Sequence, residues 1–148
     1  MRKFSYISAI ALAAVATPAL ANEARVELRG GVAWVPGVST EVIGVALGYD
    51  ADVGGNVFVG GEVVADTDFD FASPVIGVNV RLGTNVGEST KLFVTGGYAR
   101  DTSFDLDDAV IGAGAQFGLG SKSFVSVQYQ RYLDTDVNRA TVGVGFKF

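Results

Sequence analysis

Hydrophobic and polar residues alternate along nearly the whole chain after residue 21, with the two-residue period of a β-strand. The C-terminal segment shows this most clearly, because one of its faces is entirely apolar: Ala140, Val142, Val144, Phe146 and Phe148. Thr141 and Lys147 share the opposite face with two glycines. No segment shows a convincing 3.6-residue period, and the scattered glycines disfavour helices. The pattern therefore predicts an all-β protein.

The alternation divides into eight segments that we predict to be strands. They span residues 24–35, 42–49, 57–65, 75–83, 91–100, 109–119, 124–133 and 139–148. The stretches between them are rich in Gly, Asp, Ser and Asn, which favour turns. Asp-Thr recurs after three of the strands, at residues 66–67, 101–102 and 134–135. This recurrence indicates a repeated β-hairpin, and four hairpins make eight antiparallel strands.

Residues 1–21 have the features of a secretory signal peptide. Arg2 and Lys3 are followed by an apolar stretch from 7 to 16, and residues 19–21 offer a small-x-small cleavage site. The stretch is too short for a spanning helix, which needs about 20 apolar residues. We therefore predict export, and a mature barrel domain over residues 22–148.

Composition excludes several classes of function. Acidic residues outnumber basic ones, which opposes nucleic-acid binding. The sequence has no cysteine and no histidine, so a disulfide framework, a thiolate metal site and a Ser-His-Asp arrangement are all ruled out. Glu27 and Glu62 are the candidates for a carboxylate-only mechanism, but we interpret them as ion-pair partners of nearby Arg and Lys. We predict no catalytic residue, no cofactor and no enzymatic activity.

The direction of the apolar face separates two kinds of eight-stranded barrel. Soluble barrels bury that face, whereas membrane barrels turn it towards lipid. The predicted strands have roughly the 9–11 residues needed to cross a bilayer. Aromatic residues gather towards both ends of the apolar face: Trp34, Tyr98, Tyr49, Phe117, Phe146 and Phe148. These features favour an eight-stranded antiparallel up-and-down transmembrane β-barrel with a polar lumen and a lipid-facing apolar exterior.

The polar face supplies the residues expected to fill the lumen, which in an eight-stranded barrel is just wide enough for side chains. We predict ion pairs there among Arg25, Glu27, Arg29, Glu62, Arg81 and Lys147. Phe58, Phe93 and Phe124 break the polar-inward rule at equivalent positions of the repeat. Two interpretations stay open: an apolar plug near one mouth, or a bulge that shifts the register at the strand starts.

With the signal peptide, the eight alternating segments and the terminal Phe146-Lys147-Phe148 in view, the sequence resembles a small outer-membrane β-barrel family, the opacity-type, porin-like eight-stranded surface proteins. The resemblance covers the whole mature chain and implies an outer-membrane location in a Gram-negative bacterium. It also implies that the last strand carries the signal read by the barrel-assembly machinery, through Val142, Val144, Phe146 and Phe148. The family often has an aromatic residue where Ala140 stands, so this position departs from its pattern.

Acidic loops form the second candidate site. Because they should converge at one mouth, we predict a weak divalent-cation cluster of oxygen ligands. Its members are Asp66, Asp68, Asp70, Asp101, Asp105, Asp134 and Asp136. The sequence lacks the glycine and closing glutamate of an EF-hand, and this absence favours the other interpretation, ordinary solvated loops.

The favoured function is a structural or surface-interaction role in the cell envelope. The expected partners are outer-membrane lipid, lipopolysaccharide and the assembly machinery, and we expect a monomer. A narrow porin for ions or very small solutes is the first alternative. A soluble periplasmic ligand-binding barrel and a lipid-modifying enzyme that uses Glu27 or Glu62 are the others.

Overall fold

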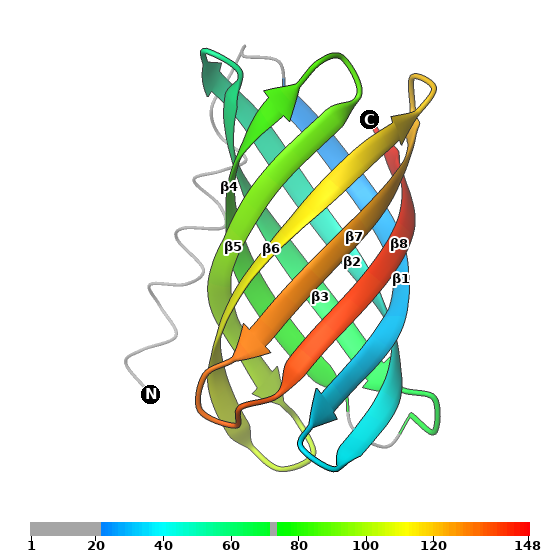
Figure 1. Ribbon diagram of the computed structural model, residues 1–148, viewed down its shortest axis with the longest axis vertical. Coiled ribbons are helices and arrows are strands. Elements are labelled where there is room, and N and C mark those ends of the chain that lie inside the picture. Colours follow the sequence, from blue (N-terminus) through cyan, green and yellow to red (C-terminus); the bar gives the residue numbers. More distant parts are fainter. Residues whose placement is uncertain (1–21, 72–73) are drawn as a thin grey trace.

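The computed structural model describes residues 22–71 and 74–148, which form a closed barrel (Figure 1). The predicted signal peptide lies outside the described residues. The eight strands are β1 (Asn22–Val35), β2 (Val38–Gly54), β3 (Val57–Asp68), β4 (Val75–Val86), β5 (Thr90–Asp101), β6 (Leu106–Leu119), β7 (Ser123–Tyr132) and β8 (Asn138–Lys147). Each pairs antiparallel with the next, and β8 pairs with β1. The predicted fold class, an up-and-down eight-stranded antiparallel barrel, is confirmed.

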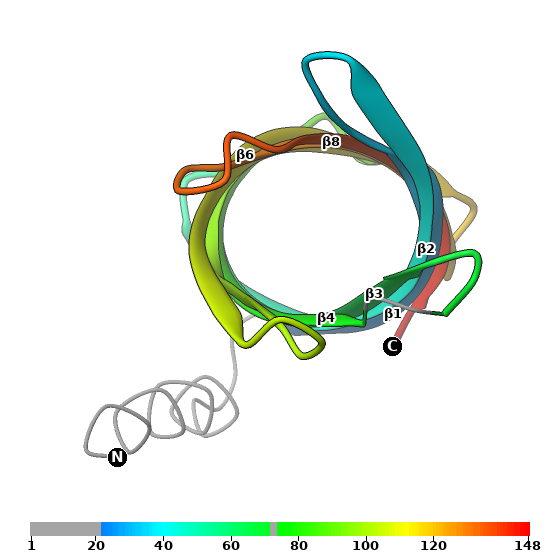
Figure 2. The same cartoon turned by 90° about the horizontal axis from the view of Figure 1, so that it is seen from below.

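The first and last strands complete the ring that Figure 2 shows end-on. Arg25 lies opposite Lys147, and Trp34 lies opposite Asn138. At the end of this seam the Ala24 N–H donates to the Phe148 carbonyl at 3.3 Å, and the Phe148 N–H donates to the Ala24 carbonyl at 2.8 Å. Closure removes the free sheet edges. In a hydrocarbon layer without water, the backbone N–H and C=O groups of such edges would have no hydrogen-bond partner.

The barrel has two mouths that differ in what they carry. The terminal mouth, at the top of Figure 1, holds the C-terminus, the start of β1 and the turns β2–β3, β4–β5 and β6–β7. The hairpin mouth, at the opposite end, holds the connections β1–β2, β3–β4, β5–β6 and β7–β8. The acidic segments of the sequence repeat therefore gather at the hairpin mouth.

Most strands are longer than the sequence pattern predicts, and β2 differs most. We expected it at 42–49, but it runs over Val38–Gly54. The first connection is only the turn Pro36-Gly37, where Gly37 has a φ of 88°, so residues 38–41 continue the ladder with β1. At the other end, Asp50 pairs with Glu23 and only then does a bulge interrupt the register. An aspartate that resembled a turn residue is thus part of the strand.

The two faces of the sheet are inverted relative to a soluble barrel. Outward side chains are apolar and exposed, with Leu47 60%, Val94 55% and Val144 55% accessible. Inward side chains are mostly polar and buried. Lipid covers such an exterior in a membrane barrel. A soluble ligand-binding barrel would need the opposite arrangement, so that alternative is wrong. Among residues 22–71 and 74–148 there is no long apolar helix that could cross a membrane.

Candidate functional site

Ion pairs between arginines and carboxylates fill the middle of the lumen. Arg25 of β1 donates from Nη2 to Glu62 Oε2 of β3 at 2.7 Å. Four residues further along β1, Arg29 donates two hydrogen bonds to Asp66, from Nε to Oδ1 at 2.9 Å and from Nη2 to Oδ2 at 2.6 Å. Arg139 of β8 binds the same Asp66 Oδ2 at 2.8 Å. Charge-assisted, bidentate hydrogen bonds such as those from Arg29 to Asp66 are among the strongest hydrogen bonds in proteins.

The structure brings together several of the predicted lumen residues, although not always in the predicted pairs. Arg25 lies 3.7 Å from Glu27, and Arg29 lies 3.8 Å from Glu62. Glu27 also accepts a hydrogen bond from the Ser126 hydroxyl at 2.7 Å. These four charged residues are buried in the lumen, as the alternation predicts.

Arg81 and Lys147 have different partners from those we expected. Arg81 lies 3.5 Å from Asp50 and donates to the Gln116 amide oxygen at 3.3 Å, instead of pairing with Glu27 or Glu62. Lys147 sits at the terminal mouth, where its Nζ is 3.6 Å from Glu23. Lys147 does not pair with Glu27 or Glu62 because it lies at a different height along the barrel axis, as the last residue of β8.

Three important lumen residues were missed by the sequence pattern. Asp50 and Asp66 lie inside β2 and β3, where the sequence pattern predicts turns, and Arg139 is the first residue of a predicted strand. The signal was present, because extending the two-residue period by one residue puts both aspartates on the inward face, and Arg139 already shares that face with Thr141. With them, the described lumen carries four buried arginines and five buried carboxylates: Arg25, Arg29, Arg81, Arg139, Glu27, Asp50, Glu62, Asp66 and Asp108.

Three phenylalanines form an apolar layer near the terminal mouth, which we call the collar. Phe58, Phe93 and Phe124 point into the lumen and are 0%, 6% and 1% exposed. The pairing of β3, β5 and β7 with the strand that follows each of them is regular at these residues, and all three rings point inwards, which favours the plug. The bulge in this region lies on β2, between Asp52 and Gly54.

Each collar ring lies over a glycine of the next strand. Phe58 pairs with Gly83, Phe93 with Gly114, and Phe124 with Gly145. A Cβ at Gly83 would come 2.7 Å from the Phe58 ring, and one at Gly114 would come 2.6 Å from the Phe93 ring. The glycines therefore create the space in which the rings lie. In the first hairpin Arg25 takes the place of the ring, over Gly48.

Arg81 joins the collar to the ionic network. Its guanidinium carbon lies 3.9 Å from the centre of the Phe93 ring and 5.7 Å from that of Phe58. A cation over an aromatic face is attracted by the ring's quadrupole, most strongly where water is excluded. Arg81 is 1% exposed, so this stacking takes place in a desolvated layer.

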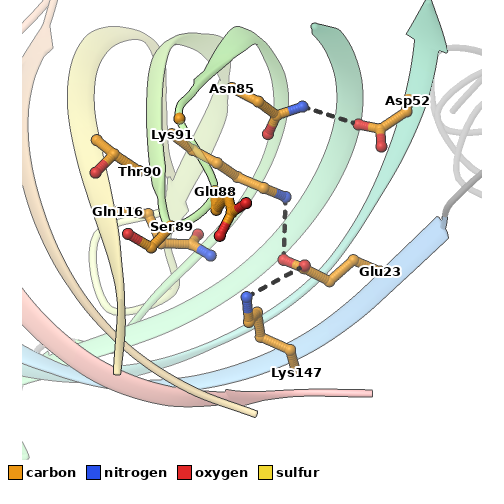
Figure 3. Close-up of a pocket in the computed structure, with 10 residues that line it drawn as sticks. Glu23, Asp52, Asn85, Glu88, Ser89, Thr90, Lys91, Gln116 and Lys147 are labelled. Carbon is orange, nitrogen blue, oxygen red and sulfur yellow. Dashed lines mark hydrogen bonds and ion pairs between the residues drawn. The ribbon is translucent and has the colours of Figure 1, made fainter. Parts of the chain in front are cut away.

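The terminal mouth ends in a polar pocket of about 310 Å³ that Figure 3 shows. Lys91 of β5 reaches across it and donates to Glu23 of β1 at 3.0 Å and to Asp50 at 3.3 Å. β5 and β1 lie on opposite sides of an eight-stranded ring, so this ion pair spans the barrel. Asn85 and Asp52 add a hydrogen bond of 3.2 Å at the pocket wall. The Lys91 ammonium also lies 4.8 Å from the Phe58 ring, directly outside the collar.

The predicted cation cluster is not assembled at the hairpin mouth. Within residues 22–71 and 74–148, no group of three or more carboxylates could hold a metal ion. Asp66 is a lumen residue bound to two arginines, so its assignment to a loop cluster was wrong. Asp105 and Asp136 bind Arg100 and Arg131 of their own hairpins.

The other predicted ligands lie apart along the same mouth. Asp101 accepts hydrogen bonds from the backbone N–H groups of Ser103 and Phe104, at 2.8 and 3.2 Å. Asp70 is exposed, and Asp68 lies at the end of β3. Asp134 donates its backbone N–H to Asp108 Oδ1 at 2.8 Å. Acidic side chains thus mostly stabilise individual turns and pair with single arginines.

Two arginines project outwards at the rim of the hairpin mouth. Arg100 and Arg131 are half exposed and each follows a tyrosine by two residues on the same face, Tyr98 and Tyr129. Tyr129 packs against Trp34 with ring centres 6.3 Å apart. Tyrosine and tryptophan mark the interface between hydrocarbon and headgroups. The arginines therefore lie one step beyond that interface.

Comparison with known proteins shows what this architecture is similar to. The sequence matches, over residues 7–148, the model of a family described as the outer membrane protein beta-barrel domain. No curated protein sequence matches it significantly. The N-terminal β-barrel domain of Pseudomonas aeruginosa OprF is similar in fold, with a TM-score of 0.62 and 16% identity over 85% of this chain and 97% of that one.

Two further solved barrels have the same fold. Ail, the attachment invasion locus protein of Yersinia pestis, solved with the heparin analogue sucrose octasulfate, has a TM-score of 0.60 and 16% identity over 88% of this chain and 100% of that one. The outer membrane enzyme PagL has a TM-score of 0.60 and 14% identity over 84% of this chain and 98% of that one. At such identities the likeness concerns the fold alone.

Proposed function

Because the chain belongs to the family described as the outer membrane protein beta-barrel domain, it is an outer-membrane barrel, and we propose that it serves there as a closed surface protein. In this role it supports the integrity of the envelope and contacts lipopolysaccharide or a host molecule at the hairpin mouth. It is neither an open porin nor an enzyme. The buried, charge-paired lumen is the observation that carries the proposal.

The lumen supports a closed barrel because its side chains are withdrawn from solvent. Arg29, Arg81 and Phe58 are 2%, 1% and 0% exposed. In an aqueous channel the lining residues would be accessible along the whole length. Here the arginines are also fixed by carboxylates, and removing one partner of such a buried pair is strongly destabilising. A narrow porin remains the competing function.

The same lumen argues against an enzyme. Glu62 is buried and bound to Arg25, while Glu27 is held by Ser126 and lies near the same arginine. A general acid or base must come within hydrogen-bond reach of its substrate. Lipid substrates lie outside the barrel, on the opposite face of the sheet. PagL has this fold and is an enzyme, so the proposal rests on these residues rather than on the fold.

The rim arginines are the proposed contact with lipopolysaccharide. With both termini in the periplasm, the hairpin mouth faces outwards, and Arg100 and Arg131 lie at the level of lipid phosphates. Their present partners, Asp105 and Asp136, are 81% and 70% exposed in their side chains. Ion pairs at such exposed positions contribute little, about 0–1 kcal/mol, so phosphate can replace the carboxylate.

A host contact would involve the tips of the loops. Phe69 and Phe104 are 59% and 68% exposed and stand among aspartates. Ail was solved with a polyanionic heparin analogue, but the loops of this chain are acidic and favour a cationic partner instead. Complementary charge chiefly speeds association and determines specificity.

Two further expectations complete the proposal. The barrel-assembly machinery reads the last strand, whose outward residues Val142, Val144 and Phe146 are more than half exposed. The protein works as a monomer, because the ring of strands closes within one chain.

Two measurements test the proposal. The purified barrel, inserted in planar lipid bilayers, should give no stable current steps, and regular steps would favour the porin. A strain without the protein should take up more of a hydrophobic dye through its outer membrane, and expression of the wild type should reverse this. Unchanged uptake in that strain would argue against the envelope role.

A further inference from the structure

We propose that the lumen on the hairpin side of the collar holds bound water among its ion pairs, and that the collar of Phe58, Phe93 and Phe124 is the barrier that keeps the barrel closed to ions. The inference rests on the proposed function and deepens it, because it names the residues responsible for closure. Without the collar the barrel would be a narrow pore.

The collar brings three apolar rings into the lumen near the terminal mouth. Its rings come from β3, β5 and β7, which alternate around the ring of strands, and each occupies the space above a glycine of the following strand. Arg81 of β4 covers two of the rings, at 3.9 and 5.7 Å from their centres. The layer is therefore filled from several sides of the barrel.

On the hairpin side of the collar, several buried polar atoms have no hydrogen-bond partner among the described residues. They are the Arg29 Nη1, the Gln128 Nε2 and the Thr95 hydroxyl. The ion pairs of Arg25 with Glu27 and of Arg29 with Glu62 span 3.7 and 3.8 Å, too long for hydrogen bonds. An unsatisfied buried polar group costs about 1–3 kcal/mol. Water satisfies such groups where a site is polar, so this part of the lumen suits a string of bound waters.

On the opposite side, the collar meets the polar pocket of the terminal mouth. Lys91 is 13% exposed in its side chain and Glu23 22% exposed, so the ion pair across the mouth is in contact with water. An ion pair of this kind attracts water and small ions instead of excluding them. The collar thus separates two polar regions, and an apolar constriction between polar regions blocks ions by staying dry.

The experiment replaces all three rings in one variant, Phe58→Ala/Phe93→Ala/Phe124→Ala, and records its conductance in planar bilayers. We expect discrete current steps where the wild type has none. The matched control is Val59→Ala/Val94→Ala/Val125→Ala, which removes apolar side chains from the next positions of the same strands on the lipid face. Folding of every variant is checked by the mobility of unboiled protein on a gel.

The outcomes separate this inference from the proposed function. Current steps in the wild type would contradict the closed barrel itself. A folded, silent triple variant would overturn the collar as the barrier and transfer that role to the ion pairs. Current steps in the lipid-face control would show that loosened packing, rather than loss of the collar, produces leakage, and this too would overturn the inference.

A single substitution provides a second route if the triple variant does not fold. Phe93→Ala removes the ring that stacks on Arg81, and Val94→Ala is its control. Both are reconstituted in vesicles that hold a pH-sensitive dye, because protons cross a chain of waters more readily than ions cross a narrow pore. Faster proton entry with Phe93→Ala alone supports the inference, and equal rates in the two folded variants overturn it.

Discussion

Phe93 and Gly114 face each other across β5 and β6, and the ring of Phe93 occupies the space that a side chain at Gly114 would fill. The same relationship joins Phe58 to Gly83 and Phe124 to Gly145. Three of the four hairpins therefore place an aromatic ring on a cross-strand glycine near the terminal mouth. This recurring Phe–Gly pair has a physical explanation, because small and large residues must alternate across neighbouring strands to fill a narrow lumen.

Gly114→Ala should destabilise the barrel by about 1–3 kcal/mol, the usual cost of overpacking a filled core. The added Cβ would lie 2.6 Å from both the Phe93 ring and the Val127 carbonyl oxygen. Urea unfolding in lipid vesicles, followed by the fluorescence of the single tryptophan, Trp34, measures the change.

Gly96→Ala is the control for this prediction. It lies on the same strand as Phe93, on the outward face, where no atom comes within 4 Å of an added Cβ. Its stability should equal or slightly exceed that of the wild type. Equal effects of the two substitutions would show that the glycines matter only for backbone conformation.

Asp66→Ala should be the most damaging single change in the lumen, with a loss of about 3–5 kcal/mol. It removes the carboxylate that hydrogen-bonds both Arg29 and Arg139 in a buried setting, and it leaves Arg29 only its longer contact with Glu62 at 3.8 Å. The measurement is again urea unfolding, supported by the gel mobility of unboiled protein.

Asp70→Ala provides the comparison, because Asp70 is an exposed residue of the same hairpin. It should leave stability within experimental error. If Asp66→Ala were as mild as Asp70→Ala, the two arginines would have to find other acceptors, and the charge-paired lumen would no longer explain the stability of the barrel.

The sequence predicts the number, order and pairing of the strands well, because each strand repeats the two-residue alternation over many positions. It predicts the ends of strands poorly, and Asp50 and Asp66 show why. Asp is typical of turns, so a local pattern assigns Asp50 and Asp66 to loops, although the ladder continues through them. Only the tertiary pairing determines where a strand stops.

The individual ion pairs are also beyond a local pattern. The alternation places Arg81 and Lys147 inside the barrel, but their partners depend on the stagger between strands, which sets the height of each side chain. Lys91 and Glu23 are neighbours only because β5 and β1 face each other across a ring of eight.

Asp108→Ala should loosen the β7–β8 loop while the barrel stays intact. The Asp108 carboxylate accepts hydrogen bonds from the Asp134 N–H at 2.8 Å, the Thr135 N–H at 3.1 Å and the Thr135 hydroxyl at 2.6 Å. Loop tips that lose such anchors become sites of proteolysis. Limited digestion with an Asp-specific protease should cut the variant between β7 and β8 faster than the wild type.

Asp107→Ala serves as the control, since Asp107 is an exposed neighbour whose contact is with Arg100 at 3.6 Å. It should not change cleavage of the β7–β8 loop. Faster cleavage in both variants would mean that the β6 end as a whole, rather than one carboxylate, orders this loop.

Arg100→Ala/Arg131→Ala tests the proposed lipopolysaccharide contact and should weaken binding without unfolding the barrel. The side chains of Arg100 and Arg131 are 39% and 48% exposed. Each of their ion pairs therefore contributes only about 0–1 kcal/mol to stability. The measurement is the binding of fluorescent lipopolysaccharide to detergent-solubilised barrel at several salt concentrations. We expect weaker binding and a smaller salt dependence, because fewer phosphates are neutralised and salt screens exposed charges.

Lys122→Ala is the control. Lys122 is an exposed cation in the β6–β7 turn at the terminal mouth, and its replacement should leave binding unchanged. If the lysine variant lost as much affinity as the double arginine variant, the contact would depend on overall charge, and the rim site would have to be abandoned.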